Sequence, residues 1–291
     1  MTVTKGIFVG LSTIDIVYDV DDFPVLDTKI TAKSQSVFAG GPATNAAVTF
    51  RHMGGEAVLV TGVGRHPIGG LIREEMSQYS VKLLDLSPEF AEVPVISAVA
   101  VNAAGQRNVI SANAIRIKVP STHVEPSILR FASVVLVDGH YIQACQAWAE
   151  AARRNGIRVV LDGGSWKQGL EELLRHVDTA ICSADFRPPG CSDPERLIEF
   201  LERRGVAEIA VTAGSGPIRF TAGRDSGFIP VPHVQVVDTM GAGDILHGAY
   251  CWYRAQGFSF SEALGKAAVI ASESCRFSGT RAWMLSDRKP S

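Results

Sequence analysis

The sequence lacks the motifs of several common enzyme classes. Its Gly265-Lys266 pair continues with Ala267, so the GxxxxGK[ST] signature of a P-loop nucleotide site is absent. The stretch 62–67 begins like a dinucleotide fingerprint but has Pro67 where the third glycine belongs, which argues against a Rossmann-type NAD site. No HExxH or GxSxG motif and no His/Cys cluster with zinc spacing occurs, so zinc and serine hydrolases are not indicated.

The balance of charges and the distribution of apolar residues also argue against several kinds of partner. Lys plus Arg number 28 against 30 Asp plus Glu, and no basic run suggests binding to nucleic acid or to an anionic membrane surface. The apolar runs are too short to span a bilayer, and the first residues lack the apolar core of a secretion signal. The five cysteines include no CxxC pair, which argues against a disulfide framework. We therefore expect a cytoplasmic protein with reduced cysteines and small-molecule ligands.

The distribution of apolar residues indicates an α/β fold. Short runs rich in β-branched residues alternate with stretches that have apolar residues at three- and four-residue spacing. Such runs suit strands buried on both faces, so we expect a central, mostly parallel sheet with helices on both faces. At 291 residues the chain has room for one large domain, residues 1–291. The predicted strands are 6–10, 57–63, 134–137, 157–161, 179–182 and 208–212, and the predicted helices include 44–53, 69–79, 143–154, 194–204 and 261–277.

A second group of strands interrupts this alternation. The segments 14–20, 29–38 and 95–109 resemble antiparallel strands without a helix signal, and 103–106 reads as a hairpin turn. A small strand group is not stable alone. We expect it to fold over one edge of the main domain as a β-sheet lid, formed by about 13–38 and 94–111. Its exposed edge leaves open a homodimer that pairs two lids.

The segment 237–244 combines a glycine turn with an acidic residue at a predicted helix start. Free main-chain amides and the helix dipole stabilise phosphate oxygens at such a place. A carboxylate that faces bound phosphate is repelled unless it has a task, and accepting the proton of an attacking hydroxyl fits Asp244. The alternative is that Asp244 only interacts favourably with the helix dipole.

The segment 39–47 is a second glycine turn that opens a predicted helix, with Pro42 in its first turn. Its exposed amides and the Asn45 side chain are suited to neutral hydroxyl groups. The alternative is that Asn45 caps its own helix and that the turn is only a turn.

Together, Ala39-Gly40-Gly41-Pro42-Ala43-Thr44-Asn45 and Asp238-Thr239-Met240-Gly241-Ala242-Gly243-Asp244 resemble the two signatures of the PfkB, or ribokinase-like, carbohydrate kinases. Their order and separation match as well, and the resemblance covers nearly the whole chain. It implies a three-layer ribokinase-like fold with a small β lid that closes over the sugar. It also implies Asp244 as the catalytic base, an anion hole from the amides of Gly241, Ala242 and Gly243, and a sugar site at Asp15, Gly40, Gly41 and Asn45.

Two further residues are candidates for contacts with the sugar. Asp138 follows a central strand, at the carboxyl edge where α/β sheets bind ligands, although a structural turn is the alternative. Arg107 lies just past the predicted lid hairpin, where it faces either the substrate or the solvent.

For the nucleotide, the resemblance points to the segments 211–216 and 267–274, where small side chains leave room for adenine or simply pack a helix. The stretch 182–186 departs from the family, because Ser183 and Phe186 replace the polar members of its Asn-x-x-Glu motif. Asp185 remains as a candidate metal contact. We expect Mg²⁺ with ATP to be needed and leave a monovalent-cation requirement open. The predicted nucleotide residues are Ser183, Thr212, Gly214, Gly216, Ala268, Ala271 and Ser274.

These features predict an ATP-dependent carbohydrate kinase. The segments 162–164 and 244–248 resemble ketohexokinase-like members, which favours a ketose such as fructose; a ribokinase or nucleoside kinase is the alternative. From another class, a non-catalytic sugar- or nucleotide-binding regulator is suggested by the altered Asn-x-x-Glu region, although the intact Asp244 counts against it. A purely structural α/β protein would leave both motifs unexplained.

Overall fold

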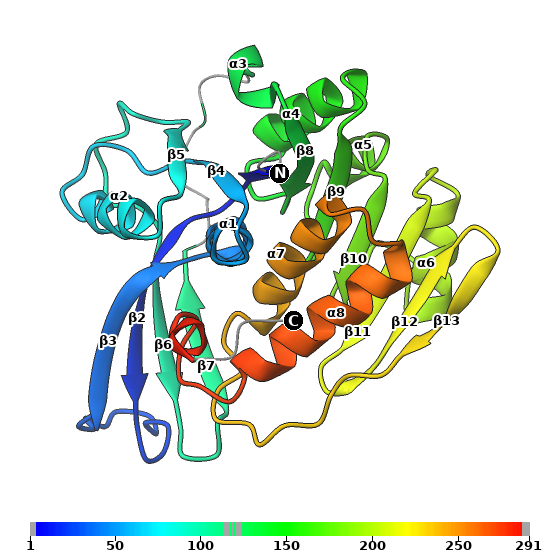
Figure 1. The fold of residues 1–291 in the computed structure, drawn as a ribbon. Coiled ribbons are helices and arrows are strands. Elements are labelled where there is room, and N and C mark those ends of the chain that lie inside the picture. The colour runs from blue at the N-terminus through cyan, green and yellow to red at the C-terminus, as the bar shows by residue number, and fades with distance from the viewer. Residues whose placement is uncertain (1–3, 113–116, 118, 120–123, 287–291) are drawn as a thin grey trace.

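The computed structural model describes residues 4–112, 117, 119 and 124–286. Its main element is a nine-stranded sheet in the order β13-β12-β11-β10-β9-β8-β1-β4-β5 (Figure 1). The strands from β5 to β11 in this order are parallel, and β12 and β13 pair antiparallel at one edge. They comprise β1 (Lys5–Val9), β4 (Glu56–Thr61), β5 (Lys82–Asp85), β8 (Ala132–Val137), β9 (Arg158–Gly163), β10 (Thr179–Ser183), β11 (Glu208–Ala213), β12 (Gly216–Ala222) and β13 (Asp225–Ile229).

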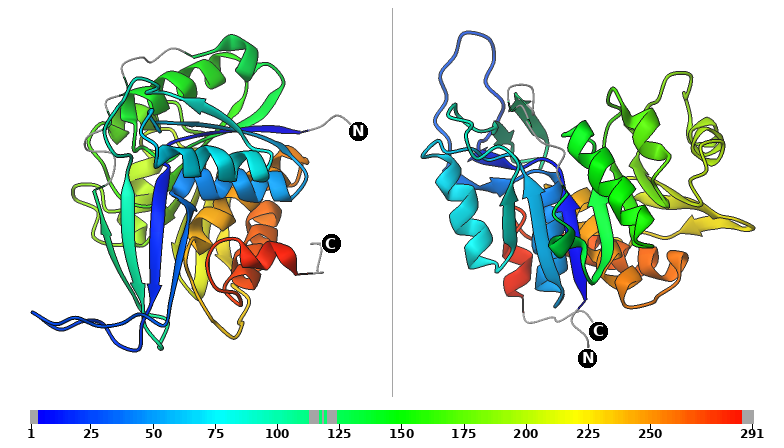
Figure 2. Two further views of the ribbon diagram at one scale, coloured as in Figure 1. Left: turned by 90° about the vertical axis from the view of Figure 1, so that its left-hand side faces the viewer. Right: turned by 90° about the horizontal axis from the view of Figure 1, so that it is seen from above.

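Helices cover both faces of this sheet (Figure 2), as the sequence predicted. One apolar cluster joins the sheet to α1 (Pro42–His52), α2 (Gly69–Gln78), α7 (Ala242–Ala255), α8 (Phe260–Ser274) and the 3₁₀ turn η1 (Ala282–Leu285). A second cluster joins the opposite face to α3 (Pro126–Leu129), α4 (Ile142–Arg154), α5 (Leu170–Leu174) and α6 (Pro194–Glu202). The alternation of a strand is visible in β1, where Phe8 packs in the first cluster and Ile7 and Val9 in the second.

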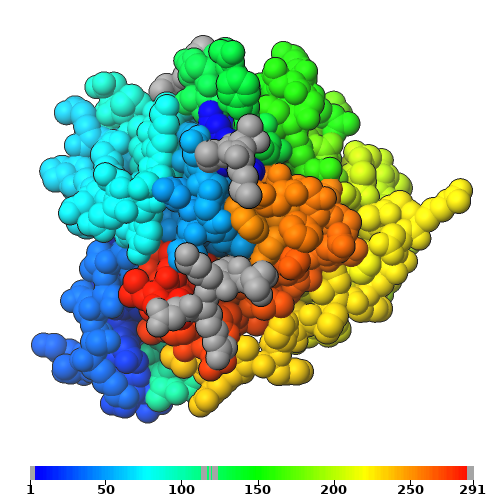
Figure 3. Space-filling model, viewed as in Figure 1, coloured from blue at the N-terminus to red at the C-terminus, as the bar shows by residue number. Residues whose placement is uncertain are grey.

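A separate four-stranded sheet has the order β3-β2-β6-β7. Its strands are β2 (Thr13–Asp19), β3 (Ser34–Gly40), β6 (Ile96–Val101) and β7 (Arg107–Ser111). The β2–β3 and β6–β7 pairs are antiparallel, as expected, but β2 and β6 are parallel. The physical reason is that these two strands are joined through β3, α1, β4, α2 and β5, and a long crossover permits parallel pairing. In the space-filling view β2 and β3 lie beside η1 (Figure 3).

Helices α1 and α7 approach each other closely because the residues between them are small. A Cβ atom on Gly248 would lie only 2.4 Å from the main-chain oxygen of Ala46. Ala46, Ala47 and Ala249 are fully buried at this crossing. The short approach allows the first turns of the two helices, which carry the two sequence motifs, to meet.

None of the helices in the described ranges is long and apolar enough to cross a bilayer.

Candidate active site

The two sequence motifs meet at one point of the structure. The Asn45 side chain, in the first turn of α1, donates a hydrogen bond of 2.7 Å from Nδ2 to Oδ2 of Asp244, in the first turn of α7. These residues are 199 positions apart in the chain. Asn45 is buried, and its amide is therefore fixed beside the carboxylate.

The start of α7 offers main-chain donors beside this carboxylate. The helix cap, Gly241, has φ 66°, and the amides of Gly241, Gly243 and Asp244 have no hydrogen-bond acceptor among the described residues. The amide of Ala242, one of the three predicted anion-hole donors, instead donates to Thr239 O at 3.3 Å. Gly243 is exposed, and no atom lies within 4 Å of the position of an added Cβ. The geometry therefore leaves Gly241, Gly243 and Asp244 itself as the available amides.

Burial controls the electrostatics of Asp244. It raises the pKa of this carboxyl to about 7, and the nearby negative charge of Asp162 acts in the same direction, as does that of Asp15 more weakly. The hydrogen bond from Asn45 and the proximity of His247 lower the pKa and offset part of the shift. Asp244 is thus balanced between its two protonation states near neutral pH, which suits a general base.

Asp162 and His247 form a buried pair beneath this site. The His247 ring lies with Nδ1 2.7 Å from Gly243 O and Nε2 3.1 Å from Ile181 O. A neutral imidazole has a single N–H, so only the imidazolium donates to both carbonyl groups. Nδ1 is also 3.5 Å from Oδ2 of Asp162, an oxygen without a hydrogen-bond partner among the described residues. Burial raises the pKa of Asp162, and the charge of His247 opposes that shift.

The predicted sugar residues Asp15 and Gly40 lie against each other where the small sheet joins the main domain. An added Cβ on Gly40 would be 1.9 Å from Oδ2 of Asp15. The Thr13 hydroxyl donates to Oδ1 of Asp15 at 2.6 Å. Burial raises the pKa of Asp15, while hydrogen bonds from Thr13 and Ser97 and the charge of Arg281 oppose that shift. Glycine at position 40 therefore provides the space that this carboxylate occupies.

Two other predicted sugar contacts have different surroundings. The Asp138 carboxylate accepts main-chain hydrogen bonds from Leu11 N at 2.8 Å and from His140 N at 2.9 Å, as in the alternative interpretation of a structural turn. Arg107 pairs with Val101 in the small sheet, whereas Asp15 pairs with Ser97. Four residues along a strand correspond to about 13 Å, so the main chain of Arg107 lies well away from that of Asp15. A role for either residue in sugar binding stays a prediction.

Several predicted nucleotide residues lie together at the carboxyl ends of β10 and β11. Ser183 pairs with Thr212, and Ala213 pairs with Gly216 across the following turn. The Ser183 hydroxyl donates to Gly164 O at 2.8 Å. On α8, by contrast, Ala268, Ala271 and Ser274 are buried, and the Ser274 hydroxyl donates to Ala271 O. These three residues of α8 therefore pack within the core. A contact with nucleotide stays a prediction for them and for the other predicted nucleotide residues, including Gly214.

The altered Asn-x-x-Glu region has a structural use. Phe186 is buried, and its ring packs edge-on against Trp166 with 5.5 Å between centroids. Asp185 is exposed. The described residues contain no group of three His, Cys, Asp or Glu side chains arranged for a metal ion. A metal contact through Asp185 stays a prediction.

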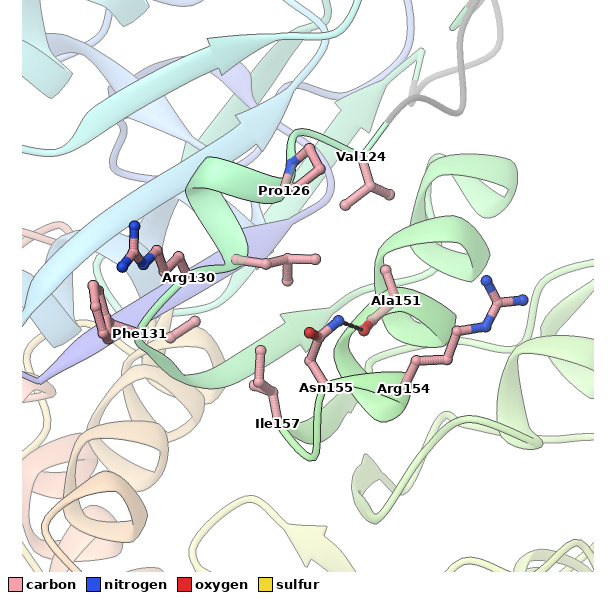
Figure 4. Close-up of a pocket in the computed structure, with 10 residues that line it drawn as sticks. Val124, Pro126, Arg130, Phe131, Ala151, Arg154, Asn155 and Ile157 are labelled. Carbon is pink, nitrogen blue, oxygen red and sulfur yellow. Dashed lines mark hydrogen bonds between the residues drawn. The ribbon is translucent and has the colours of Figure 1, made fainter.

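Two cavities lie apart from the Asp244 carboxylate. One of about 670 Å³ lies at the amino ends of β8 and β9, between α3 and α4 (Figure 4), and none of the predicted site residues lines it. Its labelled arginines, Arg130 and Arg154, point away from each other. Another, of about 490 Å³, lies between the small sheet and the segments 237–238 and 278–282. It adjoins the candidate site through Arg281, which lines it and also contacts Asn45.

Arg281 and Glu75 are site residues that the sequence did not indicate. Arg281 precedes η1 and donates to Asn45, while Glu75 on α2 accepts from Arg281. Neither belongs to a glycine turn or to a motif, and a single sequence carries no signal that pairs residues this far apart.

Comparison with known proteins supports the interpretation of the two motifs. Residues 3–287 match the family model described as pfkB family carbohydrate kinase. The chain belongs to this family, and it is therefore a phosphotransferase that uses a sugar hydroxyl as acceptor.

Individual relatives share less than a third of their residues with this chain. A ribokinase from Arabidopsis thaliana is 27% identical, with 91% of this chain and 74% of the relative covered. An aminoimidazole riboside kinase from Salmonella typhimurium is 27% identical over 80% of this chain and 82% of the relative. The solved structure of an Arabidopsis thaliana ribokinase with ribose and ATP has a TM-score of 0.78 at 23% identity, covering 96% of this chain and 94% of that one. At this identity the structural likeness shows the fold alone. The ketohexokinase-like branch is not specifically supported.

Proposed function

We propose that this protein transfers the γ-phosphate of ATP to a hydroxyl of ribose or of a ribose-containing sugar. The observation that carries the proposal is the Asn45–Asp244 hydrogen bond, which holds a partly buried carboxylate beside the free amides at the start of α7. Relatives that act on ribose and on a riboside support the ribokinase alternative over the ketose favoured by the sequence.

In the proposed reaction Asp244 accepts the proton of the sugar hydroxyl as the hydroxyl oxygen attacks the γ-phosphorus of ATP, and the bond from that phosphorus to the β,γ-bridging oxygen breaks to release ADP. The amides of Gly241, Gly243 and Asp244 stabilise the charge on the transferring phosphoryl group. Asp15, Gly40, Gly41 and Asn45 orient the sugar, and the four-stranded sheet acts as a lid that excludes water.

Mg²⁺ bound with ATP would offset the negative charge of the β- and γ-phosphates during transfer. We propose Asp185 as the candidate protein contact for this ion, which commonly takes most of its ligands from phosphate oxygens and water. A monovalent-cation requirement stays open.

The pH dependence of the rate follows from the raised pKa of Asp244. The base must be ionised, so with a pKa of about 7 we expect kcat to fall as the pH drops below neutrality, by about tenfold per pH unit well below the pKa. Steady-state rates between pH 5.5 and 9 measure this decline, the acid limb of the pH–rate profile. A rate that stays constant down to pH 5.5 would exclude Asp244 as a base with a raised pKa.

Substrate class is tested by Mg²⁺-dependent ADP release with ribose, deoxyribose, nucleosides and fructose, with EDTA as the control. Turnover with ribose or a riboside is the expected result. A clear preference for fructose would overturn the proposed acceptor and restore the ketose hypothesis. Tight sugar or ATP binding without turnover would instead indicate a regulator.

We further propose that two lids pair into a homodimer. Val37, Ile16, Ala98 and Ile110 are consecutive neighbours across all four strands of the small sheet, and Val37 and Ile110 are 50% and 77% exposed. An apolar row of this kind favours association. We expect light scattering to report a dimer that Ile110→Lys dissociates; a monomeric wild-type protein would disprove it.

A further inference from the structure

Arg281 is a largely buried cation that has several hydrogen-bond partners close to the candidate base. Its side chain is 12% exposed, and Nε donates to Oε1 of Glu75 at 3.0 Å; the Glu75 side chain is 15% exposed. The guanidinium also lies over the Tyr79 ring, 5.6 Å from its centroid. A buried ion pair is weak evidence for stability by itself, because desolvation offsets its attraction. The other hydrogen bonds of the pair are therefore the informative feature.

Both members of the pair hold the main chain of Ala39. Oε2 of Glu75 accepts from Ala39 N at 2.6 Å, and Nη2 of Arg281 donates to Ala39 O at 2.8 Å. Ala39 is the next-to-last residue of β3 and directly precedes the Gly40-Gly41 turn. The pair thus fixes the main chain at the junction between the small sheet and the main domain.

The same guanidinium determines how the Asn45 amide is oriented. Nη1 of Arg281 donates to Oδ1 of Asn45 at 2.8 Å and to the Thr280 hydroxyl at 2.8 Å. Arginine has only donors, so the oxygen of the Asn45 amide must face it. The NH₂ group of Asn45 is consequently directed at Asp244, to which it donates. An unbroken series of hydrogen bonds therefore connects the small sheet, Arg281, Asn45 and Asp244.

We propose that Arg281, held by Glu75, is a positioning residue. It couples the position of the small sheet against the main domain to the orientation of Asn45 and, through Asn45, of Asp244. The inference rests on the proposed role of Asp244 as the base. Arg281 itself has no assigned contact with sugar or phosphate. Its effect is indirect, because it prevents the Asn45 amide from turning away from the carboxylate.

Loss of Arg281 is expected to change the pKa of Asp244 in one direction, upward. The charged groups that face Asp244 are Asp162, His247 and Asp15, and the Asn45 hydrogen bond lowers its pKa. Arg281 in turn lowers the pKa of Asp15. Without Arg281 the Asn45 amide loses its fixed orientation, so the pKa of Asp244 rises and the acid limb of the rate profile moves to higher pH.

The test compares Arg281→Met with Arg276→Met, whose parent arginine belongs to a more exposed pair with Glu273. We expect Arg281→Met to lower kcat by about tenfold to 10²-fold, the scale of a misplaced reacting group, and to shift the acid limb upward. Arg281→Lys should retain part of the rate. Arg276→Met should leave both the rate and the limb unchanged. An Arg281→Met enzyme with an unshifted limb would overturn the proposal.

A double-mutant cycle with Asn45→Ala separates positioning from general destabilisation. If Arg281 acts through Asn45, Arg281→Met has little further effect on kcat in the Asn45→Ala background. Rate losses that multiply would contradict this pathway. Melting temperatures establish that each variant is folded at the assay temperature.

One readout does not depend on turnover. Titration of Asp244 by NMR in protein labelled with [γ-¹³C]aspartate, assigned with Asp244→Asn, should show a higher pKa in Arg281→Met than in the wild type. An unchanged pKa overturns the coupling even if no sugar in the panel is phosphorylated. Failure of the kinase proposal is thereby distinguished from failure of this inference.

Discussion

Replacing Asp244 with asparagine lowers kcat by about 10²- to 10⁴-fold, the usual contribution of a general base, while the affinity for sugar and ATP changes little. Asparagine has nearly the same shape but cannot accept the proton of the attacking hydroxyl. Steady-state kinetics at pH 8, beside Asp225→Asn as an exposed carboxylate control, measures the effect. A loss below fivefold would mean that another group is the base.

The same variant has a predictable effect on stability. Because burial raises the pKa of Asp244 to about 7, the folded state binds a proton at pH values where the unfolded carboxyl, with its ordinary pKa of 3.8, has released it. The stabilising contribution of that proton is fully present below the unfolded pKa and is lost as the pH rises through about 7. Asp244→Asn should therefore raise the melting temperature more at pH 8 than at pH 4.

The second large effect is expected at Gly248, where α7 crosses α1. A methyl group at this position meets the main-chain oxygen of Ala46 at 2.4 Å and Cβ of Thr49 at 2.7 Å. Neither atom belongs to the flexible end of a side chain, so the two helices must separate. We expect Gly248→Ala to cost about 1–3 kcal/mol of the free energy of unfolding, the range for overpacking, and to lower kcat as Asn45 moves away from Asp244.

Gly70 provides the matched control. It lies in α2, has no atom within 4 Å of an added Cβ, and has no positive φ. Gly70→Ala should therefore be neutral or slightly stabilising, because alanine is the better helix former. Denaturant unfolding of both variants provides the comparison. Equal stability of Gly248→Ala and the wild type would show that the crossing tolerates a methyl group and that the proposed constraint on Asn45 is wrong.

The sequence was sufficient for the layers of the fold and for the residues of its two motifs. Runs such as 134–137 and 209–211 are apolar throughout because both faces of these strands are covered, and this pattern is local. The β12–β13 hairpin was not predicted, since Pro217, Gly223 and Gly227 interrupt its alternation. The parallel β2–β6 pairing was missed as well, because strand partners are set by tertiary contacts rather than by local pattern.

In the candidate site, too, the residues within local motifs were predictable and those defined only by tertiary contacts were not. Asp244 and Asn45 belong to glycine turns that open helices, a local signal, and the structure joins them by a hydrogen bond. The hydrogen bond from the Ala242 amide to Thr239 O depends on the detailed geometry of the helix cap. Arg281 and Glu75 have meaning only as a pair that is separated by 206 positions, so no local pattern identifies them.

The central claim is that Asp244 activates a sugar hydroxyl for attack on ATP. It is tested most directly by following ribose phosphate and ADP together, by mass spectrometry, with Mg²⁺ at pH 8 for the wild type and Asp244→Asn. The account predicts that sugar phosphate and ADP form in equal amounts in the wild type and that both nearly disappear in the variant. Sugar phosphate formed at similar rates by the two proteins would contradict it.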